Sequence, residues 1–359
     1  MGKDALSTKR VGDHPKFLYI ESGMLDKVQD LRYGTNPSQT AALYNPNSFL
    51  GSLKELRTGK EGASQTNMED IFYAAVMVGY FVHPAVMIMK HENPSGFAAG
   101  LTLEPLSHTY RKARDADFRA AFGGTVFFNR PVDMETAETT KELFTEVVVA
   151  PGYEEGVVAS FKGSTRAFEY DEKAFRKIPR HPGEELEPEL KRLSDGSVIR
   201  SDAYLLPIRN ETDLEKYVVS RQQPTNSQLF DLLTGCRLNK LRSNSIRLVK
   251  NGYTTALGVG QQDRVMCIDI AAYKNFRLAE LAKKEGVERI ADYTISGSVL
   301  VSDGFFPFTD SVELAHELGA TALLAPHGGQ RFAEVLSKAD EYGMVFVDLP
   351  AEMRFFEHH

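Results

Sequence analysis

A lysine and a histidine stand side by side at the end of an apolar run. Residues 85–89 have the length and composition of a buried strand, and Lys90 and His91 follow directly. Residues 93–96 have the composition of a turn, so we expect the pair at the carboxyl end of a strand, where α/β sheets bind ligands. The lysine offers a cation for developing negative charge, and the imidazole moves protons near neutral pH. The dipeptide alone predicts only a generic proton-handling site.

A second candidate site follows the apolar residues 299–302. Two carboxylates, Asp303 and Asp310, enclose three phenylalanines. One interpretation is an aromatic core cluster in which Asp310 caps the next helix. The other is an aromatic platform for a planar heterocycle, whose ring nitrogens donate hydrogen bonds to Asp310. Residues 258–260 (GVG) offer backbone amides to a phosphate, although the flanking hairpin pattern does not match a dinucleotide fingerprint.

Several familiar catalytic motifs are missing from the sequence. His91-Glu92 has no second histidine at HExxH spacing, and no H-x-E with P-C-x-x-C is present to hold a deaminase zinc. Neither a Walker A loop nor a G-x-S-x-G elbow occurs. We expect Cys236 and Cys267 to be buried apolar residues. The sequence therefore predicts acid/base and electrostatic catalysis without a catalytic metal.

The elements that must position these residues alternate between strand and helix patterns. We expect a helix over 67–82 capped by Asn67, and a hairpin turn at Asn251-Gly252. Residues 160–239 are charged and irregular, and we expect an exposed connection without a site there. The alternation predicts a layered α/β fold with parallel crossovers, and the element order of the second half repeats that of the first. The other expected helices cover 104–115, 133–144, 264–285, 311–318 and 330–342, and the other strands cover 125–129, 146–152, 299–302, 322–325 and 344–347.

Composition limits the class of protein. The chain has 359 residues, of which 42% are hydrophobic, and a formal net charge of -7. About two domains are expected from this length. The sequence has no block of Lys and Arg, so we do not expect sequence-independent binding to the phosphate backbone of nucleic acids. The amino terminus has no apolar signal core, so we expect no export and no membrane insertion. The two cysteines are too few for a disulfide scaffold, which fits a reducing cytoplasm.

The separate motifs occur in the order of one known family. They are LRYGTNPSQ (31–39), MKHENPSG (89–96), AFGG (121–124), EVVVAPGY (146–153), SNS (243–245), GVGQQDR (258–264), SDGFFPFTD (302–310) and MRFFEHH (353–359). With these motifs the chain resembles the AICAR transformylase (phosphoribosylaminoimidazolecarboxamide formyltransferase) domain of the bifunctional purine-biosynthesis enzyme. Only thirty residues precede the first motif, so the resemblance implies a stand-alone transformylase, with IMP cyclohydrolase as a separate enzyme.

The resemblance implies a reaction, a fold and an assembly. The reaction transfers the formyl group of the co-substrate 10-formyltetrahydrofolate to the 5-amino group of AICAR, giving FAICAR and tetrahydrofolate. The fold would be a pair of cytidine-deaminase-like α/β/α units without zinc, at 31–195 and 196–359, after an extension at 1–30. The second range includes a connecting segment. The assembly would be a homodimer with active sites at the subunit interface. The resemblance leaves open whether the chain binds a monovalent cation.

Site residues carry over motif by motif. His91 would handle the proton of the amine, Lys90 would stabilise charge and protonate the departing folate nitrogen, and Asn244 would orient the formyl group. The nucleotide would be held by Arg32, Tyr33, Gly123, Glu146, Phe305 and Arg354. The folate would be held by Phe122, Arg264, Phe308 and Asp310.

Departures from the family text leave two alternatives open. Ser38 replaces the usual histidine of NPHQ, and His327 is a candidate substitute for that imidazole. One alternative is an enzyme of the same scaffold with another amino-imidazole substrate or formyl donor. The other is a catalytically silent nucleotide-binding relative that pairs with a partner enzyme. The presence of Lys90, His91 and Asn244 argues against the silent version.

Overall fold

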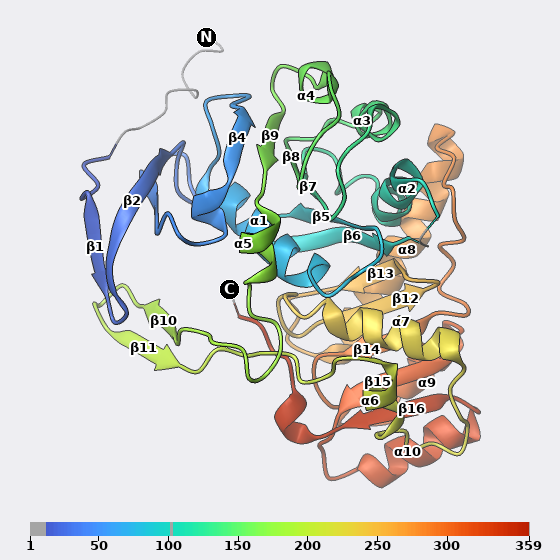
Figure 1. Cartoon of the computed structure of the whole chain (residues 1–359). Helices are drawn as coiled ribbons and strands as arrows, with labels where there is room; N and C mark the ends of the chain where they lie inside the picture. Colours follow the sequence, from blue (N-terminus) through green and yellow to red (C-terminus); the bar gives the residue numbers. More distant parts are fainter. Residues whose placement is uncertain (1–11, 101–102, 359) are drawn as a thin grey trace.

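The computed structural model describes residues 12–100 and 103–358, a range that contains every predicted site residue. The final His359 lies outside the described residues. A single mixed sheet of eleven strands runs through the molecule, in the order β16-β15-β14-β12-β13-β6-β5-β7-β8-β9-β4 (Figure 1). The predicted α/β class is confirmed, and parallel pairs join β7, β8 and β9 and also β14, β15 and β16, as expected for parallel crossovers. Antiparallel pairs join the remaining strands, and of these the sequence predicts only the hairpin at Asn251-Gly252.

The strands of the large sheet are β4 (Lys54–Arg57), β5 (Ala85–Lys90), β6 (Asn93–Ala99), β7 (Thr125–Phe128), β8 (Val147–Ala150), β9 (Arg166–Glu169), β12 (Ile246–Lys250), β13 (Tyr253–Gly258), β14 (Val299–Ser302), β15 (Ala322–Pro326) and β16 (Val345–Leu349). The helices that connect and cover them are α1 (Gln65–Val78), α2 (Leu106–Ala116), α3 (Met134–Lys141), α4 (Val157–Ser160), α5 (Glu172–Arg176), α6 (Glu211–Glu215), α7 (Asn226–Arg237), α8 (Arg264–Glu285), α9 (Asp310–Glu317) and α10 (Phe332–Glu341).

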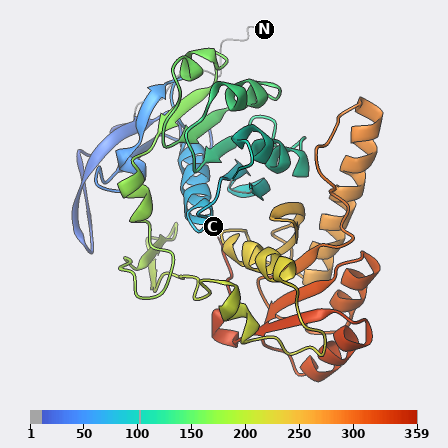
Figure 2. The same ribbon diagram turned by 45° about the vertical axis from the view of Figure 1, so that its right-hand side comes forward.

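The two halves of the large sheet have the same strand order and the same strand directions. In β6-β5-β7-β8-β9 an antiparallel hairpin pairs antiparallel with a third strand, and two parallel strands follow. The set β13-β12-β14-β15-β16 repeats this pattern. The element order from α1 to β9 likewise equals that from α7 to β16. The turned view shows the first half, in blue to green, above the second half, in yellow to red (Figure 2).

Strand directions bring distant motifs to one edge of the sheet. The halves meet at β6 and β13, which pair antiparallel, so β5 and β14 run in the same direction. Their carboxyl ends therefore lie at the same edge as the amino ends of β7, β8 and β12. We call this the site edge, because Lys90, Gly123, Glu146, Asn244 and Asp303 all lie at these strand ends.

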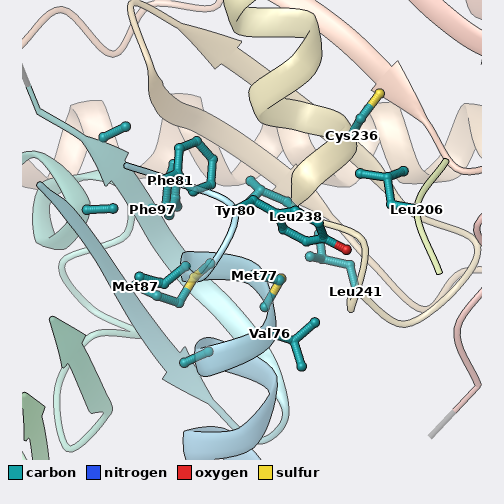
Figure 3. Packing of buried hydrophobic residues seen from close by; sticks show 14 of the residues in the cluster. Val76, Met77, Tyr80, Phe81, Met87, Phe97, Leu206, Cys236, Leu238 and Leu241 are labelled. Atoms are coloured by element: carbon teal, nitrogen blue, oxygen red, sulfur yellow. The ribbon is translucent and has the colours of Figure 1, made fainter. Parts of the chain in front are cut away.

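Apolar residues alternate between the two faces of the sheet. Met87 and Met89 face the side covered by α1 and α7, where one continuous core joins both halves. In that core Tyr80 and Phe81, which follow α1, lie near Phe97 of β6 and Leu238 beyond α7 (Figure 3). Val86 and Ile88 face the other side, where α2, α3 and α4 pack. The matching face of the second half is covered by α8, α9 and α10.

Three local expectations need correction. Helix α1 is capped by Ser64, whose side chain accepts the N–H of Asn67, while the Asn67 side chain accepts the N–H of Ser64. Asn67 is therefore the third residue of a capping box rather than the cap. The turn of the first hairpin is His91-Glu92, and residues 93–96 belong to β6. The stretch 160–239 is not merely an exposed connection, because it includes β9 and the mostly buried α7.

Two small sheets extend from the first half and expose apolar side chains. The first consists of β1 (Phe17–Ile20), β2 (Gly23–Leu31) and β3 (Ala41–Tyr44), and the second is the hairpin of β10 (Glu189–Arg192) and β11 (Val198–Ser201). An ion pair of 2.9 Å between Glu21 and Arg200 links them. Their exposed apolar residues include Leu18, Tyr19, Ile20, Met24, Leu190, Val198 and Ile199. In the described part of the chain, no helix has the length and apolar character needed to cross a membrane.

Close packing of α2 on β6 predicts a stability defect. A Cβ atom at Gly96 would lie 2.0 Å from the carbonyl oxygen of Ala113 in α2, a backbone atom that cannot move aside alone. We expect Gly96→Ala to lower the free energy of unfolding by about 1–3 kcal/mol, measured by urea denaturation. Gly163→Ala is the control, since the nearest atom to its Cβ is 4.0 Å away. Equal midpoints for the two variants would contradict this packing.

Candidate functional site

Lys90 is held against the loop that precedes β7. Its Nζ donates to the carbonyl oxygen of Gly123 at 2.7 Å and to that of Phe122 at 3.1 Å. His91 is exposed at the next position, in the turn itself. The structure thus places Phe122 and Gly123 beside the Lys90-His91 pair, as four residues of one corner of the site edge.

The turn that carries His91 has an unfavourable backbone conformation. His91 and Glu92 have φ values of 54° and 65°. This left-handed region costs residues with a Cβ atom about 1–2 kcal/mol each. The equivalent turn of the second hairpin has Asn251 and Gly252, the residue types that favour such turns. Surrounding contacts must therefore hold the first turn in place.

Glu146 lies next to this corner and is paired with a buried arginine. The Glu146 N–H donates to the carbonyl oxygen of Gly124 at 3.1 Å, and its carboxylate is 2.9 Å from the guanidinium of Arg166. Arg166 is 1% exposed and also donates to the carbonyl oxygens of Gly62 and Lys60. Burial lowers the pKa of Arg166, and Glu146 opposes that change. The fixed guanidinium keeps the Glu146 carboxylate oriented at the site edge.

Arg32 and Tyr33 join the same group. The guanidinium of Arg32 lies 5.1 Å from the centre of the Tyr33 ring, and its Nε is 3.5 Å from a carboxylate oxygen of Glu61. Both Arg32 and Tyr33 act electrostatically on Arg166. We call Arg32, Tyr33, Lys90, His91, Phe122, Gly123, Glu146 and Arg166 the first cluster. Sequence reasoning missed Arg166, which begins β9 in the stretch expected to be irregular, and no motif marks it.

A second cluster is centred on the buried carboxylate of Asp303. It accepts the N–H of Ser245 at 3.0 Å and the hydroxyl of Ser243 at 2.6 Å, and it faces Arg264 at 3.5 Å. Between those two serines, the Asn244 amide donates to the carbonyl oxygens of Gln261 and Gln262 at 2.9 and 3.0 Å. Asp303 thus fixes the loop that presents Asn244.

Phe305 lies between two arginines of the second cluster. The guanidinium groups of Arg264 and Arg354 are 5.8 and 5.0 Å from the centre of its ring. Arg354 also donates to the carbonyl oxygen of His327 at 2.9 Å, and the His327 ring is 2.7 Å from the carboxylate of Asp348. His327 therefore belongs to the second cluster, whereas Ser38 follows Arg32 and Tyr33 along the chain and is exposed.

The folate residues predicted around the next helix are exposed. Phe308 is 51% exposed, and the guanidinium of Arg331 lies 5.6 Å from its ring centre. Asp310 is the first residue of α9, and its carboxylate accepts the N–H of Ser311 at 2.7 Å. The N-cap is Thr309, so the interpretation of Asp310 as the cap residue is wrong. Phe305, in contrast, is partly buried beside the arginines.

The carboxyl-terminal segment packs along the second cluster. The N–H of the buried Phe355 donates to the carbonyl oxygen of Asp303 at 3.4 Å, and the N–H of Ser243 donates to that of Glu357 at 2.9 Å. The Glu357 carboxylate is 2.5 Å from the ammonium of Lys240. These contacts position Arg354 beside Phe305.

The two clusters share the site edge but are far apart along it. Four strand spacings separate β5 from β14, which is roughly 19 Å. Between them, the N–H of Arg242, which precedes β12, donates to the side chain of Asn93 at the start of β6 at 3.3 Å. A cavity of about 650 Å³ lies elsewhere, between α1 and residues 171–189, and no predicted site residue lines it. One chain therefore presents two separate clusters at this edge.

Comparisons with known proteins match this chain to one family. The family model described as AICARFT/IMPCHase bienzyme matches residues 5–274. The bifunctional purine biosynthesis protein PurH of Chlorobaculum parvum is 36% identical over 345 residues, covering 93% of this chain and 60% of that protein. The PurH proteins of Pelodictyon phaeoclathratiforme and Chlorobium phaeobacteroides are 35% and 36% identical, and 59% of each is covered. The chain thus spans about 60% of the length of these curated relatives.

The burial of Arg166 predicts a large effect on stability. Arg166→Ala removes a donor to two carbonyl oxygens and leaves Glu146 without its ion-pair partner. We expect the free energy of unfolding to fall by about 2–4 kcal/mol in urea denaturation. Arg176→Ala is the control, because that side chain is 78% exposed and pairs with Glu172 one helical turn away. A similar small effect of both changes would argue against the structural role of Arg166.

Proposed function

Because the chain belongs to the AICARFT/IMPCHase bienzyme family, we propose that it transfers the formyl group of 10-formyltetrahydrofolate to the 5-amino group of AICAR. The products are FAICAR and tetrahydrofolate. The observation that carries the proposal is the Lys90-His91 pair at the site edge, with the Lys90 ammonium held by the carbonyl oxygens of Phe122 and Gly123. A cation and an imidazole at one corner suit a reaction that needs charge stabilisation and proton transfer.

The proposed chemistry assigns a separate task to each residue. The aromatic amine of AICAR attacks the formyl carbon, a new C–N bond forms, and the formyl oxygen becomes anionic. Lys90 stabilises this charge, and His91 accepts the proton that the amine loses. The bond from the formyl carbon to the folate nitrogen then breaks, and Lys90 protonates that nitrogen. Asn244, fixed by two carbonyl oxygens, orients the formyl group.

The remaining predicted residues are proposed to bind the two substrates. Glu146, oriented by Arg166, would accept hydrogen bonds from the carboxamide of AICAR. Arg32 and Arg354 would bind its phosphate, since arginine pairs with phosphate oxygens in a two-point geometry. The nucleotide would also contact Tyr33, Gly123 and Phe305. The folate would be bound by Phe122, Arg264, Phe308 and Asp310.

We propose that two copies of the chain complete each site. Lys90 and Phe305 are about four strand spacings apart on one chain, roughly 19 Å, too far for one small nucleotide to touch both. In a twofold dimer, the first cluster of one protomer can face the second cluster of its partner. The exposed apolar residues of the two small sheets provide surface for such an assembly.

We further propose that the two halves of the large sheet are the cytidine-deaminase-like units expected from the sequence, at 31–195 and 196–359. The support is the repeated order and direction of five strands in each half. No cluster of three or more metal-binding side chains was found within residues 12–100 and 103–358. The segment 1–30 would be an extension of the first unit.

Mixing the purified chain with AICAR and 10-formyltetrahydrofolate tests the reaction. We expect tetrahydrofolate and FAICAR to form, followed by absorbance and chromatography. Lys90→Ala and His91→Ala are each expected to lower kcat by about 10²–10⁴-fold, because each removes a proton-transfer or charge-stabilising group. Lys216→Ala, at an exposed ion pair at the end of α6, is the control. Without tetrahydrofolate from the wild-type chain the proposal fails, and formation of IMP from FAICAR would indicate the other activity named for the family.

Complementation between inactive variants tests the shared site. We mix Lys90→Ala with Arg354→Ala, which change different clusters, and let subunits exchange. Half of the dimers then carry both variants, and one of their two sites is intact, so roughly a quarter of the wild-type activity should return. A mixture of Lys90→Ala with His91→Ala is the control, because both changes lie in the first cluster and every site stays defective. If the first mixture also stays inactive, each site belongs to one chain.

A further inference from the structure

Asp70 is a buried acid on α1 that contacts both sides of the Lys90 corner. It is 4% exposed, and one carboxylate oxygen accepts the N–H of Glu92 in the turn at 2.7 Å. The other accepts the hydroxyl of Thr125 at 3.3 Å. Thr125 begins β7, immediately after the loop whose carbonyl oxygens bind Lys90. The Asp70 side chain therefore connects the His91-Glu92 turn with β7, the strand that follows the two carbonyl oxygens to which Lys90 donates.

The second half of the chain contains the same contact at a different place. Asp70 is the sixth residue of α1, and Asp231 is the sixth residue of α7. Asp231 accepts the N–H of Asn251 at 2.9 Å and that of Gly252 at 2.7 Å, in the turn of the second hairpin. Since β5 and β12 run in opposite directions, this second turn lies at the edge opposite to the site edge.

Only the first of these two turns needs an acid for its shape. Asn251-Gly252 is a sequence that adopts a left-handed turn readily, whereas His91-Glu92 is not. We propose that Asp70 is a positioning residue for the formyl-transfer site: its carboxylate holds the His91-Glu92 turn, and through it the imidazole of His91 and the ammonium of Lys90, in reactive positions. This inference rests on the proposed function of Lys90 and His91.

The ionisation of Asp70 can make this contact sensitive to pH. Burial raises the pKa of Asp70 to about 7, and the nearby Glu92 adds to this effect. The hydrogen bonds from Glu92 and Thr125 and the charge of Lys90 act in the opposite direction. A carboxylate accepts an N–H hydrogen bond more strongly than a protonated acid does. The hold on the turn should therefore weaken as pH falls through about 7.

Substitution of the two equivalent acids separates positioning from general stability. In Asp70→Ala we expect kcat for formyl transfer to fall about 10- to 100-fold while KM for AICAR changes little, because reacting groups are displaced. Hydrogen exchange at residues 91–93 should become faster. Asp231→Ala is the matched control, with faster exchange at 251–252 and unchanged kcat. Asp70→Asn keeps the size of the side chain and should remove the part of the kcat profile that titrates near pH 7.

The readouts distinguish the possible failures. Unchanged exchange at residues 91–93 in both Asp70 variants would overturn the inference, whatever the activity. Equal losses of kcat in Asp70→Ala and Asp231→Ala would reduce Asp70 to a structural residue and also overturn it. If Asp70→Ala does not fold, Asp70→Asn decides through its pH profile, and an unaltered profile counts against the inference. A wild-type chain without formyl transfer refutes the proposed function and the positioning role with it, while the exchange data still show whether Asp70 holds the turn.

Discussion

The antiparallel joint between β6 and β13 determines at which edge of the sheet the predicted site residues lie. It is short: Tyr253 pairs with Ala98, the N–H of Phe97 donates to the Thr254 hydroxyl, and the N–H of Ala99 donates to the carbonyl oxygen of Gly252. Because the joint is antiparallel, the two halves are inverted relative to each other. The hairpin turn of the first half therefore shares an edge with the strand ends of the second half. A parallel joint would have put both hairpin turns on one edge instead.

This inversion gives two similar lysines different surroundings. Lys90 and Lys250 each end the first strand of a hairpin, at opposite edges of the sheet. Lys90 donates to two carbonyl oxygens. Lys250 donates to two carbonyl oxygens as well, but it also forms an ion pair of 2.8 Å with Asp292, whose pKa falls to about 2 because of that hydrogen bond. The charge of Lys250 is thus neutralised by Asp292.

Local sequence patterns predicted many of the helices and strands. The order in which distant strands pair in the sheet could not be predicted from them. The apolar runs located β5, β14, β15 and β16, and Asn251-Gly252 located the second hairpin, because periodicity and turn chemistry act over a few residues. The turn at His91-Glu92 was missed, since neither residue type favours a left-handed turn and the acid that accepts its N–H lies on α1. Arg166 was missed because its partner Glu146 is twenty residues away. The distance between the two clusters depends on strand order, which no motif encodes.

The ion pair of Lys250 with Asp292 also limits how this scaffold could be redesigned. The edge opposite to the site edge has a hairpin, an acid on the preceding helix and a lysine that match those of the Lys90 corner. Changing Asn251 to histidine would complete the dipeptide but not the site, because Asp292 neutralises the neighbouring ammonium. A designer would have to remove that carboxylate and then replace the hydrogen bond that it accepts from the N–H of Thr294. The second hairpin could therefore present a free lysine only after its ion pair with Asp292 has been removed.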